Sequence, residues 1–182
     1  MAQTEKSQTA IRSLLADNEA GNISPEDLRD ALASAMGYAG LVLSASGGPV
    51  TMTDISTTYG VIDIFDTITA ESSDVNTNGS EVVLSTDYAI TVKSSGVYKV
   101  SFWASFGVTG GGETISVALY ANGSPTILEV ERDVATSTYG VISFDGIMAL
   151  AADDIIDARI KIATGTDDVN FKSAGLSLFR VG

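Results

Sequence analysis

The feature that most constrains the fold is an alternation of apolar and polar residues, with a period of two, that runs from about residue 38 to the C-terminus. In residues 97–106, Tyr98 and Phe102 belong to the apolar set, and the intervening positions are small or polar apart from Trp103. Side chains alternate in this way along β-strands that bury one face. The sequence therefore predicts strands, not helices, over most of its length.

Short segments rich in Gly, Asn, Asp and Ser, such as Asn122-Gly123, interrupt the alternation and indicate turns. Ten strands are expected, at residues 38–44, 60–67, 81–84, 88–93, 96–108, 114–121, 127–134, 139–150, 155–163 and 175–181. No helical periodicity lies between them. Short strands that follow one another in this way predict an antiparallel β-sandwich or barrel.

The first 37 residues follow a different pattern and predict an arm of two short helices. Ser24 and Pro25 suit the N-cap and first turn of the second helix, and Gly37 suits its C-cap. The apolar stripe of this arm is narrow and Ala-rich, so it is better suited to docking on a partner than to forming a core. The residues expected to dock are Ile11, Leu14, Leu15, Ile23, Leu28, Leu32 and Met36. The expected division is a docking arm at 1–37, a strand and linker at 38–58, and a β-domain at 59–182.

The composition excludes several classes of function. The chain has no Cys and no His, which removes disulfides, thiolate and imidazole catalysis, and the commonest transition-metal ligands. A net charge of −13 argues against binding to nucleic acid or to an anionic membrane. No apolar run approaches the roughly 18 residues that span a bilayer, and the N-terminus lacks the pattern of a secretory signal. We expect a non-enzymatic protein, made in the cytoplasm, that needs no cofactor and does not enter membranes.

The acidic residues offer the best case for a ligand site. One group comprises Asp153, Asp154 and Asp157, and another comprises Asp167 and Asp168. Carboxylates of this kind bind calcium, but no Asp-x-Asp-x-Asp-Gly loop is present. We interpret both groups as solvated turn residues and leave calcium binding at these positions open.

Other candidate sites have simpler structural explanations. A paired-carboxylate hydrolase would need two facing acids, but acids are frequent at strand ends in so acidic a chain. The acids considered for such a pair are Asp63, Asp66, Glu71 and Asp74. Gly110 to Gly112 predict a hairpin loop, because no Lys-Ser/Thr and helix follow them as in a phosphate-binding loop. An aromatic platform for sugars is less favoured than a core or subunit interface, and its members would be Tyr98, Trp103, Tyr120, Tyr139 and Phe144.

Four segments of the β-domain resemble the jelly roll shared by tumour necrosis factor and complement globular heads. They are Gly96-Val-Tyr98-Lys-Val-Ser-Phe102, Leu119-Tyr-Ala-Asn122-Gly123, Gly146-Ile-Met-Ala-Leu150-Ala-Ala-Asp153 and Phe171-Lys-Ser-Ala-Gly175-Leu-Ser-Leu178. The resemblance covers roughly residues 88–182, with Ala152 in place of the family's usual Gly. It implies a ten-stranded jelly roll that assembles as a homotrimer. The residues expected in the trimer interface or core are Tyr98, Phe102, Trp103, Leu119, Tyr120 and Phe179.

The arm is similar to a short N-terminal segment of many bacteriophage structural proteins, on the residues Leu15-Ala-Asp-Asn18 and Gly21-Asn-Ile-Ser24-Pro25-Glu-Asp-Leu28-Arg29-Asp30. This resemblance implies a structural virion protein. We expect a trimeric capsid decoration protein, of the cement or head-fibre type, whose arm docks on the major capsid protein or another virion protein. The alternative is a tail-associated module of the same fold that recognises a host surface glycan. Capsid decoration is favoured because the chain is short and has no fibrous shaft.

Overall fold

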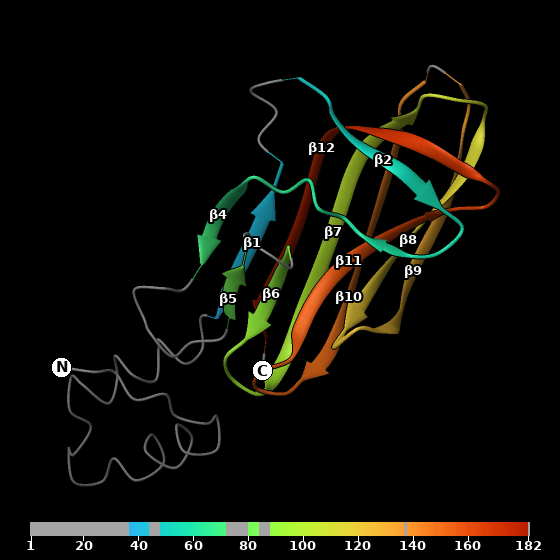
Figure 1. The fold of residues 1–182 in the computed structure, drawn as a ribbon. Helices are drawn as coiled ribbons and strands as arrows, with labels where there is room; N and C mark the ends of the chain where they lie inside the picture. The colour runs from blue at the N-terminus through green and yellow to red at the C-terminus, as the bar shows by residue number, and fades with distance from the viewer. Residues whose placement is uncertain (1–36, 44–47, 72–79, 84–87, 137, 182) are drawn as a thin grey trace, which may run out of the picture.

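The computed structural model describes residues 37–43, 48–71, 80–83, 88–136 and 138–181. Over these residues the chain forms twelve strands, and every strand pair is antiparallel (Figure 1). The helices predicted for the arm lie outside this part of the chain. The strands are β1 (Tyr38–Val42), β2 (Val50–Ser56), β3 (Gly60–Val61), β4 (Thr67–Glu71), β5 (Ser80–Val83), β6 (Ala89–Val92), β7 (Gly96–Val108), β8 (Glu113–Ala121), β9 (Ser124–Val134), β10 (Gly140–Leu150), β11 (Ile155–Ile162) and β12 (Thr166–Arg180).

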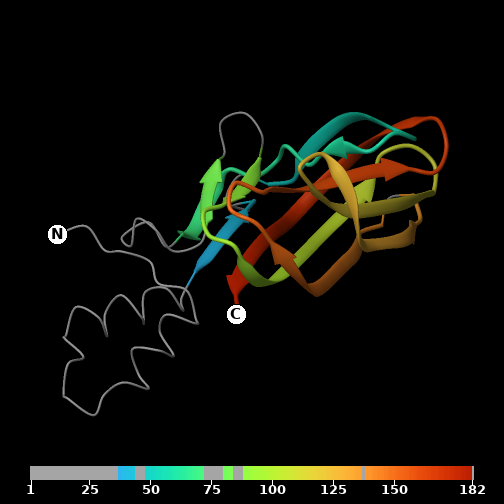
Figure 2. The same cartoon turned by 90° about the horizontal axis from the view of Figure 1, so that it is seen from below.

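The strands form two six-stranded sheets that pack against each other (Figure 2). The A sheet has the order β10-β7-β12-β1-β4, and β2 also pairs with β12. The B sheet has the order β5-β6-β11-β8-β9, and β3 also pairs with β11. The chain passes from one sheet to the other between β6 and β7, between β7 and β8, and at each connection from β9 to β12. The expectation of a mainly β, antiparallel jelly-roll sandwich is confirmed.

The core lies between the two sheets and follows from the alternation in the sequence. Every second side chain of β7 is buried, from Tyr98 through Phe102 to Phe106. Phe106 packs on Phe171 of β12, with the ring centroids 5.6 Å apart. The buried Tyr98 hydroxyl donates a hydrogen bond of 2.7 Å to the carbonyl oxygen of Ser94, so its burial leaves no polar group unpaired.

Three segments differ from the sequence prediction. The range 38–58, expected to be one strand and a linker, contains both β1 and β2, and each pairs with β12. Strand β12 begins at Thr166, well before the predicted start at residue 175. Conversely, the strand predicted at 60–67 is reduced to the two residues of β3. The β2 segment is rich in Thr and also contains Asp and Met, so its apolar–polar alternation is weak. Its long-range pairing with β12 therefore mainly specifies β2 as a strand.

The edges of the two sheets meet where β9 lies beside β10, and two glycines allow the close approach. A Cβ atom on Gly146 would lie 2.6 Å from Cδ2 of Leu128, and one on Gly140 would lie 2.6 Å from Nε of Arg132. Arg132 also donates a hydrogen bond of 2.9 Å from Nη1 to the carbonyl oxygen of Val141. Side chains of β9 thus cover the edge of β10, which protects an edge strand from unwanted pairing. Among the described residues, no helix is long and apolar enough to cross a bilayer.

Candidate functional site

The outer face of the A sheet, here called the A face, exposes large apolar side chains that no other part of the described chain covers. Strand pairing places Ile147, Lys99, Phe179 and Tyr38 in one row across four strands. Ile147 is 69% exposed, Phe179 51% and Tyr38 36%. Core side chains in the same strands are almost fully buried, so this exposure marks a surface that nothing in the described part of the chain covers.

A second row of the A face contains Ser143, Trp103, Gly175 and Val42. Trp103, the only tryptophan of the protein, is 43% exposed. The two rows are separated by a row of mainly small residues, Asp145, Ser101, Ser177 and Gly40. Small residues between aromatic rows leave the surface open to a flat or interdigitating partner. Two charged residues of these rows, Lys99 and Asp145, form an exposed ion pair, with Nζ and Oδ2 3.8 Å apart.

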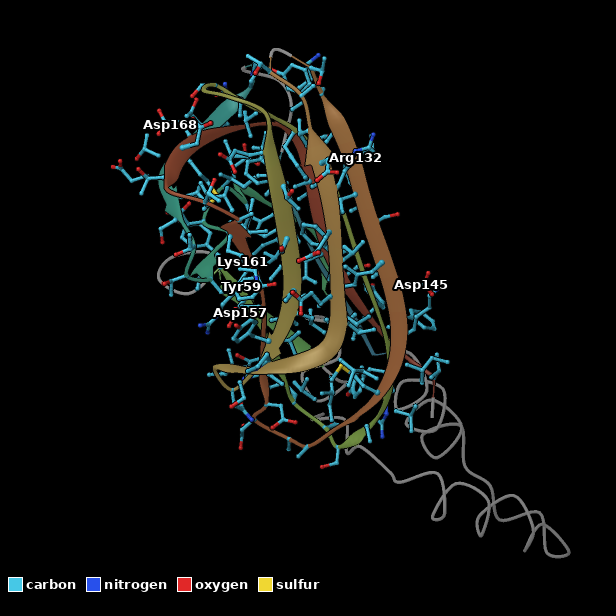
Figure 3. The ribbon with its side chains drawn as sticks, turned by 90° about the vertical axis from the view of Figure 1, so that its right-hand side faces the viewer. Tyr59, Arg132, Asp145, Asp157, Lys161 and Asp168 are labelled. Carbon is cyan, nitrogen blue, oxygen red and sulfur yellow. The ribbon has the colours of Figure 1, made fainter. Side chains whose placement is uncertain are left out.

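The outer face of the B sheet, here called the B face, is closed by its own polar and aromatic side chains. Ser116 is only 2% exposed and Tyr120 only 9%, although both point away from the core. The Arg159 guanidinium lies 4.2 Å from the Tyr120 ring centroid, and Lys161 Nζ lies 4.5 Å from that of Tyr59. Figure 3 shows Lys161, Tyr59 and Asp157 arranged along this face.

Hydrogen bonds, an ion pair and aromatic contacts join these side chains, with the Tyr59 and Tyr120 rings 5.6 Å apart at the centre. The Tyr59 hydroxyl donates to Glu129, and Lys161 Nζ lies 3.8 Å from the same carboxylate. Burial, followed by the bond to Glu129, raises the pKa of Tyr59 above its ordinary value, so the hydroxyl remains a donor at neutral pH. Arg159 binds the buried Asp157 through two hydrogen bonds, of 2.6 Å from Nε and 3.1 Å from Nη2. The hydrogen bond to Asp157 is also the main cause of a raised pKa for Arg159.

Four of the five acidic residues predicted as solvated turns have structural roles, whereas Asp153 is exposed in a turn as predicted. Asp154 accepts hydrogen bonds from Asn122 Nδ2, at 2.7 Å, and from the amide of Ala151, at 2.8 Å. Asp157, grouped with it in the sequence, is only 5% exposed and is paired with Arg159. The prediction that these two carboxylates are simply solvated was therefore wrong.

Asp167 and Asp168 also differ from the prediction, because they belong to β12 and not to a turn. Asp167 accepts hydrogen bonds of 3.0 Å from the Gly110 amide and from Thr109 Oγ1. Asp168 accepts one of 3.0 Å from the amide of Asp54. In the described part of the chain, no three Asp or Glu residues come together in a way that would hold a metal ion.

The structure divides the other predicted residues among three places. Tyr98, Phe102 and Leu119 lie in the core, Trp103 and Phe179 lie on the A face, and Tyr120 lies on the B face. Sequence reasoning missed the A-face residues Tyr38, Val141 and Ile147, and the B-face residues Tyr59, Arg159 and Lys161. A signal for the first set was present, because the predicted strand at 139–150 carries apolar residues at both odd and even positions. The arm residues Ile11, Leu14, Leu15, Ile23, Leu28, Leu32 and Met36 lie outside the described part.

Comparison with known proteins supports the fold. No protein-family model matches the sequence, and no curated protein matches it. Among solved structures, the chain is similar to the Eiger TNF of S. frugiperda, with a TM-score of 0.61 and 12% identity over 81% of this chain and 94% of that one. It is also similar to the globular domain of zebrafish complement 1qA protein, with a TM-score of 0.52 and 14% identity over 81% and 98% of the two chains. The chain therefore has the jelly-roll fold of tumour necrosis factor and complement globular heads, as the sequence motifs predict.

Proposed function

We propose that the protein is a non-enzymatic structural subunit that assembles as a homotrimer through its A face and decorates a bacteriophage virion. The exposed aromatic and aliphatic rows of the A face are the observation that carries this proposal. Exposed contiguous apolar surface on one side of a small domain marks an interaction site. The B face, closed by its own side chains, is then the side turned to solvent.

A second copy of the chain is the partner that the charges favour. Each chain carries a net charge of −13, so two copies repel each other over most of their surfaces. On the three central rows of the A face, Lys99 and Asp145 offset each other. Contact between A-face surfaces therefore buries the exposed apolar rows where the charges offset each other. The number of copies, three, rests on the resemblance of the sequence motifs to the tumour necrosis factor and complement family.

The virion role rests on the N-terminal arm. Its sequence resembles the segment through which phage structural proteins attach to the particle, and its narrow stripe suits docking. A trimer presents three such arms. Once one arm has docked, the effective concentration of the other two rises, so modest contacts add up to firm attachment.

Sedimentation velocity at micromolar concentration tests the assembly. We expect a species of three times 18.8 kDa for the wild type. Phe179→Glu, which places a charge on an already half-exposed position, should give a folded monomer with unchanged far-UV circular dichroism. Thr57→Glu, at an exposed loop position away from the A face, should leave the trimer intact. A monomeric wild type would contradict the proposal. Mass spectrometry of purified particles, with copy numbers, tests the virion role.

The second candidate function is recognition of a host surface glycan by the outward face of the same trimer. It is favoured by a depression on the B face, where several hydrogen-bonding groups have no partner among the described residues. The two functions are compatible, since they use opposite faces of the sandwich.

A further inference from the structure

A depression with a volume of about 460 Å³ lies on the B face, where β11 changes its neighbour. Strand β6 pairs with β11 at Ile155 and Ile156, and β3 pairs with it at Arg159 and Ile160. Asp157 lies between these two pairings and lines the depression. Cavities of roughly 300–1,000 Å³ are typical of small-molecule sites, so the depression has the size of a ligand site.

Several polar groups at the depression have no partner within the described chain. The exposed Asp63 carboxylate forms no hydrogen bond or ion pair with any described residue, and neither does the Tyr88 hydroxyl. Arg159 uses Nε and Nη2 to bind Asp157, which leaves Nη1 without an acceptor among the described residues. The depression thus offers acceptors, donors and one hydroxyl that can do both.

The backbone at the depression is also unusual. Tyr88 has a φ of 46°, in the left-handed region, which a bulky aromatic residue rarely adopts. Its ring packs against the core while the residue also lines the depression. Backbone strain of this kind persists only where the surrounding structure holds it, and it concentrates at ligand sites.

These groups select the chemical class of the ligand. Asp63 and Asp157 against Arg159 give a slightly acidic site in an acidic protein, which disfavours an anion. The positive charge of the Arg159 guanidinium would repel a simple cation at this site. A sugar hydroxyl both donates and accepts hydrogen bonds, so several hydroxyls satisfy a mixed set of donors and acceptors. Val61, Ile155 and the Tyr88 ring provide apolar surface for the C–H face of a sugar.

We infer that the B-face depression binds one neutral saccharide unit, with Asp63 accepting from its hydroxyls and Arg159 Nη1 donating to them. This inference rests on the second function proposed above. It is independent of trimer assembly, because all the lining residues come from one chain.

Nuclear magnetic resonance shift mapping with the methyl glycosides of glucose, galactose and mannose, at millimolar concentration, tests the inference. We expect at least one glycoside to shift the amide signals of residues around the depression, including Asp63, Tyr88 and Asn122. Asp63→Asn keeps the shape of the side chain, and Tyr88→Phe removes only the hydroxyl. Each should weaken binding roughly tenfold or more, because Asp63→Asn replaces a charged acceptor by a weaker neutral one and an amino group, and Tyr88→Phe removes a hydrogen bond to the ligand.

Asp133→Asn is the matched control, since Asp133 is an exposed carboxylate opposite Thr114, at the far end of the β8–β9 pairing from the depression and outside the A face. It should leave the affinity unchanged. The unperturbed amide spectrum of each variant verifies its fold. The inference is overturned if no neutral glycoside shifts the depression, if Asp63→Asn and Tyr88→Phe bind as the wild type does, or if only charged sugars such as glucuronic acid bind. If a glycoside shifts amide signals on another surface instead, the depression is not the binding site, but the proposed recognition of glycans is retained.

Discussion

The indole of Trp103 on β7 lies directly against Gly175 on the neighbouring strand β12. The two residues are register partners, and a Cβ atom on Gly175 would lie 2.6 Å from Nε1 of the indole. Glycine at this position lets the ring lie across the A face, where it is still 43% exposed. The position of the aromatic ring on the proposed interface therefore depends on the absence of one side chain.

Gly175→Ala is the first test of this relationship. The new methyl group forces the indole away from β12, and we expect the trimer to weaken by about 1–3 kcal/mol per contact, the usual cost of overpacking. Because Trp103 is the only tryptophan, its fluorescence reports directly on the interface. Wild-type emission should shift to longer wavelength on dilution as the trimer dissociates, and the variant should show this shift at higher concentration.

Gly111→Ala is the control for this prediction, because an added Cβ there meets nothing within 4 Å. Its emission and its dissociation on dilution should match those of the wild type. Wild-type behaviour of Gly175→Ala itself would show that the position of Trp103 does not matter for assembly.

Strand β7 shows how well local pattern predicts this fold. Its bounds, Gly96–Val108, are those expected from the sequence, because the alternation continues through the strand without a Gly-Asn or Asp-Gly signal. The turn predicted at Asn122-Gly123 is confirmed as well, with φ values of 51° and 75° that suit a tight hairpin. Both features are encoded by neighbouring residues.

The N-terminal half of β12 shows where local pattern fails. Asp167-Asp168 carries a turn signal, yet both residues belong to the strand. Their carboxylates bind the amides of Gly110 and Asp54, which are distant in sequence. Asp54 itself has a φ of 56°, which marks an irregularity opposite Asp168. Tertiary hydrogen bonds thus override the local preference, and no property of the Asp-Asp pair alone indicates this.

The candidate sites were predictable to different degrees. Trp103 was expected in an interface or core because it is the one large aromatic residue on the small, polar face of its strand, and Phe179 was assigned to the same set. The depression on the B face was not expected, since it combines Asp63, Tyr88 and Arg159 from three separate segments. Only the pairing of β11 with both β3 and β6 brings these residues together.

Removal of the buried charge at Asp157 should destabilise the fold. Asp157→Asn leaves the Arg159 guanidinium, whose side chain is only 22% exposed, without its anionic partner. We expect a loss of about 2–3 kcal/mol in the free energy of unfolding, somewhat less than for a fully buried pair. Asp133→Asn removes an exposed negative charge outside the A face and should change stability by less than about 1 kcal/mol. Urea denaturation of both variants measures the difference, and equal losses would contradict the structural role of the Asp157–Arg159 pair.

Tyr59 should make stability sensitive to alkaline pH. Its pKa is raised in the folded protein above the ordinary value of 10.0, first by burial and then by the bond to Glu129. A raised pKa means that the unfolded chain loses this proton first. The contribution of Tyr59 to the free energy of unfolding is therefore complete below pH 10. It falls as the pH rises further, by at most about 1.4 kcal/mol per pH unit.

Tyr59→Phe separates this effect from that of the other tyrosines. The variant should lose about 1 kcal/mol at neutral pH, because the hydrogen bond to Glu129 is absent. Above pH 10 its stability should fall less steeply than that of the wild type. Parallel stability curves for the two proteins, measured by urea denaturation between pH 8 and pH 11, would show that Tyr59 is not the group responsible.

Leu28 belongs to the predicted docking arm, outside the described residues, and provides the test of virion attachment. Leu28→Asp would place a carboxylate inside the proposed contact, and burial of an unpaired charge there should cost several kcal/mol per arm. All three arms of a trimer carry the same defect, so no intact arm remains to compensate. We expect a trimer that melts at the wild-type temperature but does not incorporate into particles, measured by calorimetry and by quantitative mass spectrometry of purified virions. Full occupancy of the variant on particles would show that the arm does not anchor the protein. Dissociation of the trimer would instead identify the arm as an assembly element, since the A face alone would then be insufficient to hold three copies together.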